Sequence, residues 1–376
     1  MSRGAIDIAL SGGGVRAMAF HAGVLRFLAE HGELERMRHI STVSGGSLLV
    51  GLVFQRAGMR WPSSAGYLST ILPAVRELLT TRNLQASALR RLLLPWNWRY
   101  LISRANVITQ VLQDSWNVRA TLSDLPATPV WSINGTTAET GRRFRFKSSG
   151  CGDYRLGYAE AGAFPLAQAL AVSAAFPGAI GPLAIKSDQY TWRKRPNWGA
   201  PASAEQEIQL PYTRLHLYDG GLYDNLGLEP LFDMGQQRAK SDGAMIIVCD
   251  AGAPLETGFD TSTLNPLRMK RWLDLASDQQ RALRVRSFIN ALAHGLPGAY
   301  LQIGSPAMDR LKKVSHSGTA LPWLTAVQST AAAQYTTSLS QMPADTFDLL
   351  CRHGYETAHW NSLAYPYLAD PIGPGV

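Results

Sequence analysis

Short apolar runs and helical patterns alternate along the first part of the chain. Residues 5–10 form an apolar run that ends in a run of glycines, and apolar positions then recur at helical spacing over residues 16–30. Residues 39–43 predict a second strand, and residues 45–54 predict a second helix. Strand, tight turn and helix, twice in succession, are typical of parallel strands joined by helices. The pattern therefore predicts an α/β fold.

The rest of the chain is less regular. The pattern favours mainly helical structure over residues 61–121, and a polar stretch rich in proline and glycine predicts a surface excursion over 186–211. The sequence is proline-rich and predicted to be irregular from Tyr365 onward. Further strands are predicted at 129–135, 142–147, 214–218 and 244–250, and further helices at 163–175 and 269–292.

These elements predict a single domain over residues 1–376. Its core would span about 5–250 and carry the helical insertion and the surface excursion, and a helical extension would follow over about 264–376. Hydrophobic residues make up 46% and charged residues 17% of the chain, as in ordinary globular proteins. The 3 cysteines are too few and too scattered for a disulfide framework or a zinc site.

The net charge and the absence of targeting signals limit where the protein is expected to be located and what it is expected to bind. A formal net charge of +8 suits either nucleic acid or an anionic membrane surface. The N-terminal sequence lacks the features of a signal peptide. No apolar run reaches the ~18 residues that a membrane-spanning helix needs. We therefore expect a cytoplasmic protein.

A serine at the end of the second predicted strand is the first candidate for chemistry. Residues 42–46 read Thr-Val-Ser-Gly-Gly. A sharp turn from strand to helix exposes the hydroxyl of Ser44 and requires small neighbours, which Gly45 and Gly46 provide. Ser47 is a nearby competitor, but it falls inside the predicted helix. The alternative is a glycine-rich turn in which the serine only caps the helix.

Gly12, Gly13 and Gly14 lie between the first strand and the first helix and are followed closely by Arg16 and Ala17. Glycine amides at a helix N-terminus can converge on an anion. Two uses compete, an oxyanion hole and a dinucleotide fingerprint of the form G-x-G-x-x-[GA]. The fingerprint requires an acidic residue at the end of the next strand, where this chain has the serine turn instead. The oxyanion hole is therefore favoured.

A serine nucleophile needs a base that accepts its proton. Asp219 follows a predicted strand, and the two glycines after it allow close approach. Asp224 is a second candidate, although we expect it to cap a helix near Pro230. None of the 8 histidines lies in a glycine-rich turn after a convincing strand. A histidine base such as His294 or His316 is nevertheless a second hypothesis.

Together, the glycine loop, the serine turn and the Asp-Gly-Gly turn resemble the patatin-like phospholipases in motif and in chain order. Stretches at 134–142 and 171–177 are also similar, so the likeness covers about residues 5–250. The chain departs from the family pattern at Thr42, which replaces the first glycine of G-x-S-x-G, and at Ala17, which replaces a glycine often found after the basic residue.

The resemblance implies a three-layer α/β/α fold with a central, mainly parallel sheet. It also implies a serine lipid acyl hydrolase that acts on phospholipids or other acyl lipids and needs no cofactor or metal. In this chain the implied dyad is Ser44 as nucleophile and Asp219 as base. The implied oxyanion residues are Gly12, Gly13, Gly14 and Arg16.

Residues 90–100 combine arginine, leucine, tryptophan and tyrosine. Tryptophan and tyrosine favour the lipid headgroup level, and arginine favours anionic lipid. This composition predicts peripheral contact with an anionic membrane, at its inner face, around Trp96 and Trp98. The alternative assigns residues 92–94 to the core and the arginines to an ordinary solvated face.

A second basic stretch, residues 268–286, is interleaved with Asp274 and Asp278. Acidic and basic residues at this spacing favour a helix face with i,i+4 ion pairs. Nucleic-acid binding would need a denser basic stripe and a recognition motif. We therefore expect no nucleic-acid partner.

Overall fold

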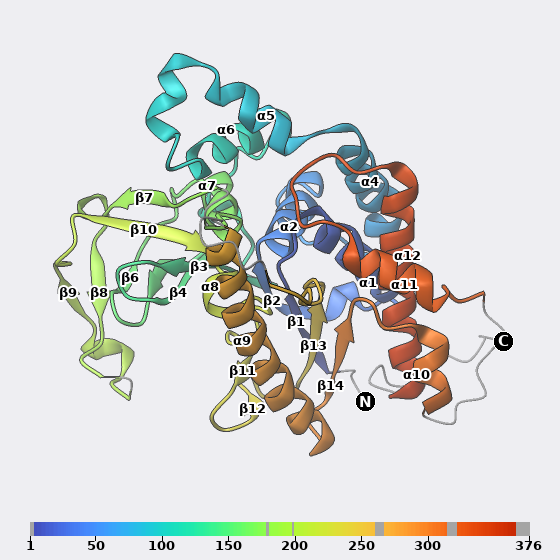
Figure 1. The fold of residues 1–376 in the computed structure, drawn as a ribbon. Coiled ribbons are helices and arrows are strands. Elements are labelled where there is room, and N and C mark those ends of the chain that lie inside the picture. The colour runs from blue at the N-terminus through green and yellow to red at the C-terminus, as the bar shows by residue number, and fades with distance from the viewer. Residues whose placement is uncertain (1–3, 178–179, 198, 260–266, 314–321, 366–376) are drawn as a thin grey trace.

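A mixed β-sheet forms the centre of the computed structural model, which describes residues 4–177, 180–197, 199–259, 267–313 and 322–365 (Figure 1). From one edge of the sheet, five strands lie in the order β14-β13-β1-β2-β3 and pair in parallel. The carboxyl ends of parallel strands meet at one edge of a sheet, where ligands bind in open α/β folds. The bounds are β1 (Ala5–Leu10), β2 (Met37–Val43), β3 (Val130–Thr137), β13 (Ala244–Asp250) and β14 (Gly298–Gln302).

Beyond β3 the sheet continues as an antiparallel extension in the order β4-β5-β6-β8-β9, while β10 also pairs with β3 and with β7. Residues 186–211, predicted as a surface excursion, thus contribute short strands to this extension. The strands named in this paragraph are β4 (Arg142–Lys147), β5 (Gly150–Asp153), β6 (Gly157–Ala159), β7 (Leu183–Lys186), β8 (Trp192–Lys194), β9 (Gln206–Ile208) and β10 (Arg214–Asp219). A separate pair consists of β11 (Phe232–Asp233) and β12 (Arg238–Ala239).

Helices cover both faces of the parallel strands. Alternate strand residues point to opposite faces, so Ile8 and Ile247 join the core beneath α1 (Gly14–Glu30) and α12 (Ala344–Ala364). Ala9 and Ile246 join a second core that includes Phe288 of α9 (Leu267–Ala293). The predicted three-layer α/β/α fold with a mainly parallel central sheet is confirmed.

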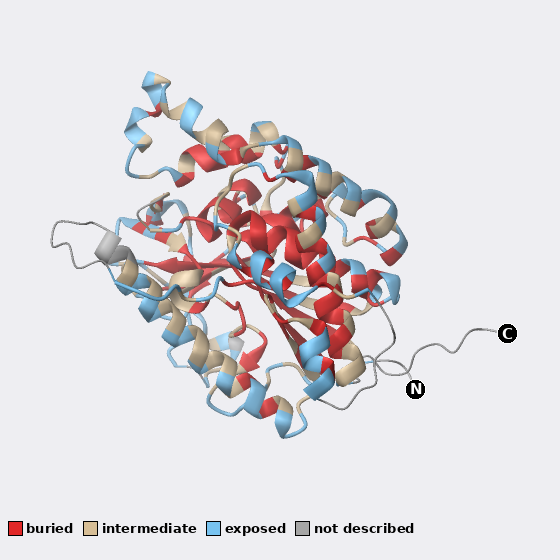
Figure 2. Ribbon diagram, turned by 45° about the vertical axis from the view of Figure 1, so that its right-hand side comes forward, coloured by how far each residue is buried: buried red, intermediate tan, exposed pale blue. Residues whose placement is uncertain are grey.

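Residues 61–121 are mainly helical, as predicted, and lie at the top of the view in Figure 1. Figure 2 shows buried residues concentrated in the sheet and in the helices packed on it, while α9 presents mostly exposed and intermediate residues. Residues 366–376, predicted to be irregular, lie outside the described residues. The other helices are η1 (Leu34–Arg36), α2 (Gly45–Arg56), α3 (Ser64–Gly66), η2 (Tyr67–Ile71), α4 (Leu72–Thr81), α5 (Leu84–Leu92), η3 (Pro95–Tyr100), α6 (Ala105–Ser115), η4 (Leu122–Asp124), α7 (Leu166–Ser173), η5 (Ser187–Gln189), η6 (Ala202–Ala204), α8 (Gly221–Asp224), α10 (Ala307–Lys313) and α11 (Ala326–Gln334).

Candidate active site

Ser44 lies at the sharp turn between β2 and α2. Its backbone has φ 49° and ψ −118°, a region that residues with a side chain rarely adopt. Strain of this kind is found where a strand turns abruptly into a helix and presents a nucleophile. A Cβ at Gly45 would lie 2.2 Å from the carbonyl oxygen of Gly14, and one at Gly46 would lie 2.4 Å from that of Leu10. The turn therefore requires both glycines.

Hydrogen bonds between buried hydroxyl groups support this turn from beneath. The Oγ of Ser47 lies 2.7 Å from Thr42 Oγ1 and 2.8 Å from Ser173 Oγ. The indole N–H of Trp131 donates to Thr42 Oγ1 at 2.9 Å, and the amide of Ser44 donates to Ser173 Oγ at 3.0 Å. The hydroxyl of Thr42, which stands where the family pattern has glycine, is thus hydrogen-bonded. Ser47 is buried in the same network.

Asp219 ends β10 and is 4% exposed. Its backbone N–H donates to the Ala175 carbonyl at 3.1 Å, and its carbonyl accepts from Thr136 Oγ1 at 2.8 Å. Burial raises the pKa of the Asp219 carboxyl to about 7, against the lowering effect of hydrogen bonds from the Gly221 amide and the Ser44 side chain. The Ser44 side chain thus lies near enough to the Asp219 carboxyl to lower its pKa, although 175 positions separate the two residues in the chain (219 − 44).

The glycine loop passes directly against the serine turn. A Cβ at Gly12 would lie 3.1 Å from Ser44 Cβ. The N–H of Gly12 donates to the Asn225 carbonyl at 3.1 Å, so this amide is already engaged. The amides of Gly13 and Gly14 make no hydrogen bond to any described residue. Of the three predicted oxyanion donors, these two have N–H groups without a hydrogen-bond partner in the part of the chain that the structure describes.

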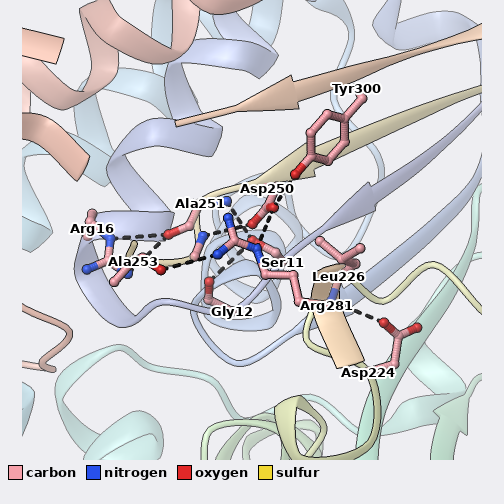
Figure 3. A network of polar contacts seen from close by, with 11 residues as sticks. Ser11, Gly12, Arg16, Asp224, Leu226, Asp250, Ala251, Ala253, Arg281 and Tyr300 are labelled. Carbon is pink, nitrogen blue, oxygen red and sulfur yellow. Dashed lines mark hydrogen bonds and ion pairs between the residues drawn. The ribbon is translucent and has the colours of Figure 1, made fainter. Parts of the chain in front are cut away.

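Arg16 is buried and anchors the glycine loop to two distant segments. Its Nε and Nη2 donate to the Ala251 carbonyl at 3.2 and 3.1 Å, and its Nη1 donates to the Tyr335 carbonyl. Figure 3 shows the guanidinium directed at Ala251. Burial lowers the pKa of Arg16 to about 10, so it stays charged at neutral pH. Its contacts fix the position of the loop.

Buried carboxylates hold the loops around the site in place through arginines of α9. Arg281 Nε donates to Asp250 Oδ2 at 2.7 Å, and the Tyr300 hydroxyl donates to the same oxygen at 2.5 Å (Figure 3). Arg284 pairs with Asp224 at 3.4 Å. These two arginines thus pair with carboxylates that lie far upstream in the chain.

Asp224 organises a loop and does not cap a helix. Its carboxylate accepts hydrogen bonds from the amides of Leu226 at 3.2 Å and Glu229 at 2.9 Å. Residues 225–243 are fully described and contain turns and two short strands, so the helix predicted near Pro230 is wrong. Like a helix cap, the Asp224 carboxylate accepts hydrogen bonds from backbone N–H groups that would otherwise lack a partner, but it does so in a turn.

Comparison with known proteins identifies the family of this chain. A family model described as patatin-like phospholipase matches residues 8–232. The chain belongs to the patatin-like phospholipase family. The matched region includes the glycine loop, the serine turn and the Asp-Gly-Gly turn. No curated protein matches the sequence.

A solved phospholipase structure has a fold similar to that of this member of the family. Human GIVD cytosolic phospholipase A2 aligns with a TM-score of 0.51 at 13% identity and covers 97% of this chain. This chain spans 63% of the length of that human protein. VipD from Legionella pneumophila aligns with a TM-score of 0.36 at 15% identity, over 95% of this chain and 66% of VipD. At 13% identity the likeness to the human protein concerns the fold alone.

Sequence reasoning missed Asn225 as a residue of the site. Its Oδ1 lies 2.4 Å from the position of a Cβ at Gly12 and 2.9 Å from that of a Cβ at Gly221. The amide group thus stands between the glycine loop and the turn that carries Asp219. No local pattern marks this asparagine, because its role depends on two loops that only the fold brings together.

The hypothesis of a histidine base gains no support from the described residues. His294 is exposed at the end of α9, and its Nδ1 lies 2.8 Å from the carbonyl of Asn290. His21 is buried, and its ring nitrogen lies 3.0 Å from the Ser11 carbonyl. None of the described histidines is a hydrogen-bond partner of Ser44. His316 lies outside the described residues.

Proposed function

We propose that this protein hydrolyses carboxylic ester bonds of phospholipids or other acyl lipids with Ser44 and Asp219 as a catalytic dyad. The observation that carries the proposal is that the Ser44 side chain, at a strained strand-to-helix turn, lies near enough to the buried Asp219 carboxyl to affect its pKa. The amides of Gly13 and Gly14, which donate to none of the described residues, lie in the adjoining loop. Membership of the family supports a lipid substrate.

The reaction would follow the usual sequence of an acyl-serine hydrolase. Asp219 takes the proton of Ser44 as its oxygen attacks the ester carbonyl, and the negative charge on the tetrahedral oxygen is stabilised by amides of the glycine loop. Asp219 then protonates the departing alcohol, which leaves an acyl-Ser44 ester. A water molecule gives its proton to Asp219 and attacks this ester, releasing the fatty acid and restoring Ser44.

Lipid turnover provides the direct test of this proposal. A mixed bacterial lipid extract incubated with the protein should release free fatty acids that mass spectrometry detects, and Ser44→Ala should release none above background. The same spectra would identify the headgroup and chain length preferred. If the wild-type protein is inert towards esters of every chain length, the alternative of a catalytically idle lipid- or partner-binding protein would be favoured.

The rate of hydrolysis should rise with pH through about 7. The carboxyl of Asp219 can act as a base only when ionised, and burial raises its pKa to about 7. At lower pH the protonated carboxyl cannot accept the proton of Ser44, so kcat/KM should fall about tenfold for each pH unit below that value. A pH–rate profile with a water-soluble ester measures this. A profile that stays flat down to about pH 5 would contradict the role of Asp219.

We also propose peripheral contact with an anionic membrane through the surface around Trp96 and Trp98. These side chains are 64% and 59% exposed, and the neighbouring Leu93 and Ile102 are 72% and 87% exposed. The alternative that residues 92–94 belong to the core is not supported, since Leu93 is exposed and the other two are half-buried. Within the described part of the chain, every helix is too short or too polar to span a bilayer.

Trp96→Ala/Trp98→Ala should weaken binding to anionic vesicles at least about tenfold, because each ring loses its apolar contact with the lipid. Liposome flotation measures the bound fraction. Trp272→Ala is the matched control, since this tryptophan is 56% exposed but lies on α9. Equal binding by the wild-type protein and the double variant would exclude this surface as the membrane contact.

A further inference from the structure

A basic cavity lies on the antiparallel extension of the sheet, apart from the serine and its base. It has a volume of about 190 Å³. Side chains of β4 line one wall, and the loop after α8 and the segment after β12 contribute further residues. Phe144 and Phe146 are buried in the core, so strand alternation places Arg143, Arg145 and Lys147 together on the opposite face.

Positive charge in this cavity is poorly compensated. Its charged lining consists of four cations, Arg143, Arg145, Lys147 and Lys240, and one carboxylate, Glu229. Glu229 pairs with Arg143 at 3.6 Å. In the described ranges, Arg145, Lys147 and Lys240 make no ion pair. Their N–H donors are therefore available to a ligand.

The positions of the cations are fixed by neutral neighbours. The Arg145 guanidinium lies 4.0 Å from the centroid of the Tyr158 ring. Arg143 Nη1 donates to Asn134 Oδ1 at 3.0 Å, and Asn134 in turn donates to the carbonyl of Thr42 at 2.9 Å. The cavity thus adjoins the support of the serine turn, and its lining includes neither Ser44 nor Asp219.

Like charges repel one another in this cavity. Burial, with the neighbouring Arg145, Arg143 and Lys240, lowers the pKa of Lys147 to about 8. A bound anion would offset this repulsion and favour the protonated lysine. The cavity is therefore better suited to a multiply charged anion than to a neutral ligand.

We propose that this cavity binds a phosphate-bearing anion. A phosphate monoester carries about −1.5 to −2 charges and three acceptor oxygens, which matches a cluster of guanidinium and ammonium donors. The planar fork of arginine suits phosphate oxygens in particular. Rings of Tyr154, Tyr158 and Tyr223 line the remaining wall and can contact the rest of the ligand.

Calorimetric titration with inorganic pyrophosphate tests the proposal without any substrate, so its outcome is independent of the hydrolase activity. Wild-type protein should bind, and Arg145→Gln/Lys147→Gln should bind at least about tenfold more weakly, because two charge-assisted contacts are lost. The matched control is Lys186→Gln/Arg214→Gln, which removes one lysine and one arginine from an exposed strand pair elsewhere in the sheet. This control should bind like the wild type.

A vesicle arm distinguishes a lipid headgroup from a soluble phosphate. Co-sedimentation with phosphatidylcholine vesicles that contain phosphatidic acid should depend on Arg145 and Lys147 if the ligand is a headgroup. If Arg145 and Lys147 are needed to bind pyrophosphate but not to bind the vesicles, the ligand of the cavity is a soluble phosphate. The proposal is overturned if neither ligand distinguishes the two double variants, or if wild-type protein binds neither.

Discussion

Ser44→Ala is expected to lower kcat/KM for ester hydrolysis by roughly 10⁴- to 10⁶-fold, because removing a serine nucleophile removes the covalent route altogether. The variant should also lose covalent labelling by a fluorophosphonate. Hydrolysis of a water-soluble ester gives the rate, and mass spectrometry of the labelled peptide identifies the modified residue. The substitution deletes only one oxygen, so the fold should be unaffected.

Ser69→Ala is the control, because Ser69 is exposed on the helical insertion. It should keep both the activity and the label. Ser47 requires attention in the same experiment, since it lies three positions beyond Ser44 and its hydroxyl is buried beneath the turn. A label on Ser47, or a Ser44→Ala variant that retains full activity, would show that the nucleophile has been assigned to the wrong residue.

Asp219→Asn should lower kcat/KM by about 10²- to 10⁴-fold and at the same time stabilise the protein. An amide can still accept the hydrogen bond from the Gly221 amide, but it cannot take a proton from Ser44. Burial raises the pKa of Asp219 to about 7 from an ordinary 3.8. Between these values the folded state binds a proton that the unfolded state has released, so stability falls as pH rises.

At about pH 8 the buried charge of Asp219 costs up to about 4 kcal/mol, which the neutral asparagine avoids. Urea unfolding of the two proteins at this pH would measure the difference. Activity and stability should therefore change in opposite directions. A variant that loses activity and unfolds more easily would indicate a structural role for Asp219.

Asp7→Asn provides a control in which the change in stability should have the opposite sign. Asp7 is also buried, and although burial raises its pKa, hydrogen bonds and ion pairs with His39 and Arg38 outweigh this and lower it. A lowered pKa contributes stability above the unfolded value, so the asparagine variant should be less stable at neutral pH. Asp7 lies in β1 at some distance along the strand from the glycine loop, and hydrolysis per folded molecule should be unchanged.

The sequence was sufficient for elements whose signals are local. Apolar runs that end in glycine predicted β1 and β2 with the turns after them, since close approach of backbone requires glycine at Gly45 and Gly46. The contact between Ser44 and Asp219 has no local signal, and it was expected only because three motifs together resembled a family. Strands of three residues, such as β8 and β9, are too short to show a period of two.

Partners that lie far apart in the chain could not be predicted from pattern. Arg281 and Arg284 appeared to belong to an ordinary helix face with acidic neighbours, yet they pair with Asp250 and Asp224. Both carboxylates are buried, and an ion pair in such a place depends on how α9 packs against the loops after β13 and α8. Asn225 likewise gains its position from tertiary contacts.

The contacts of the glycine loop have a consequence for how much chain the site needs. The family match ends at residue 232, but Arg16 donates to the carbonyls of Ala251 and Tyr335, and the amide of Val15 donates to that of Ser338 at 2.9 Å. A fragment trimmed to the matched region would keep both members of the dyad and lose the backing of the loop beside them. The polypeptide that must fold to align the motifs is therefore longer than the region in which the motifs can be recognised.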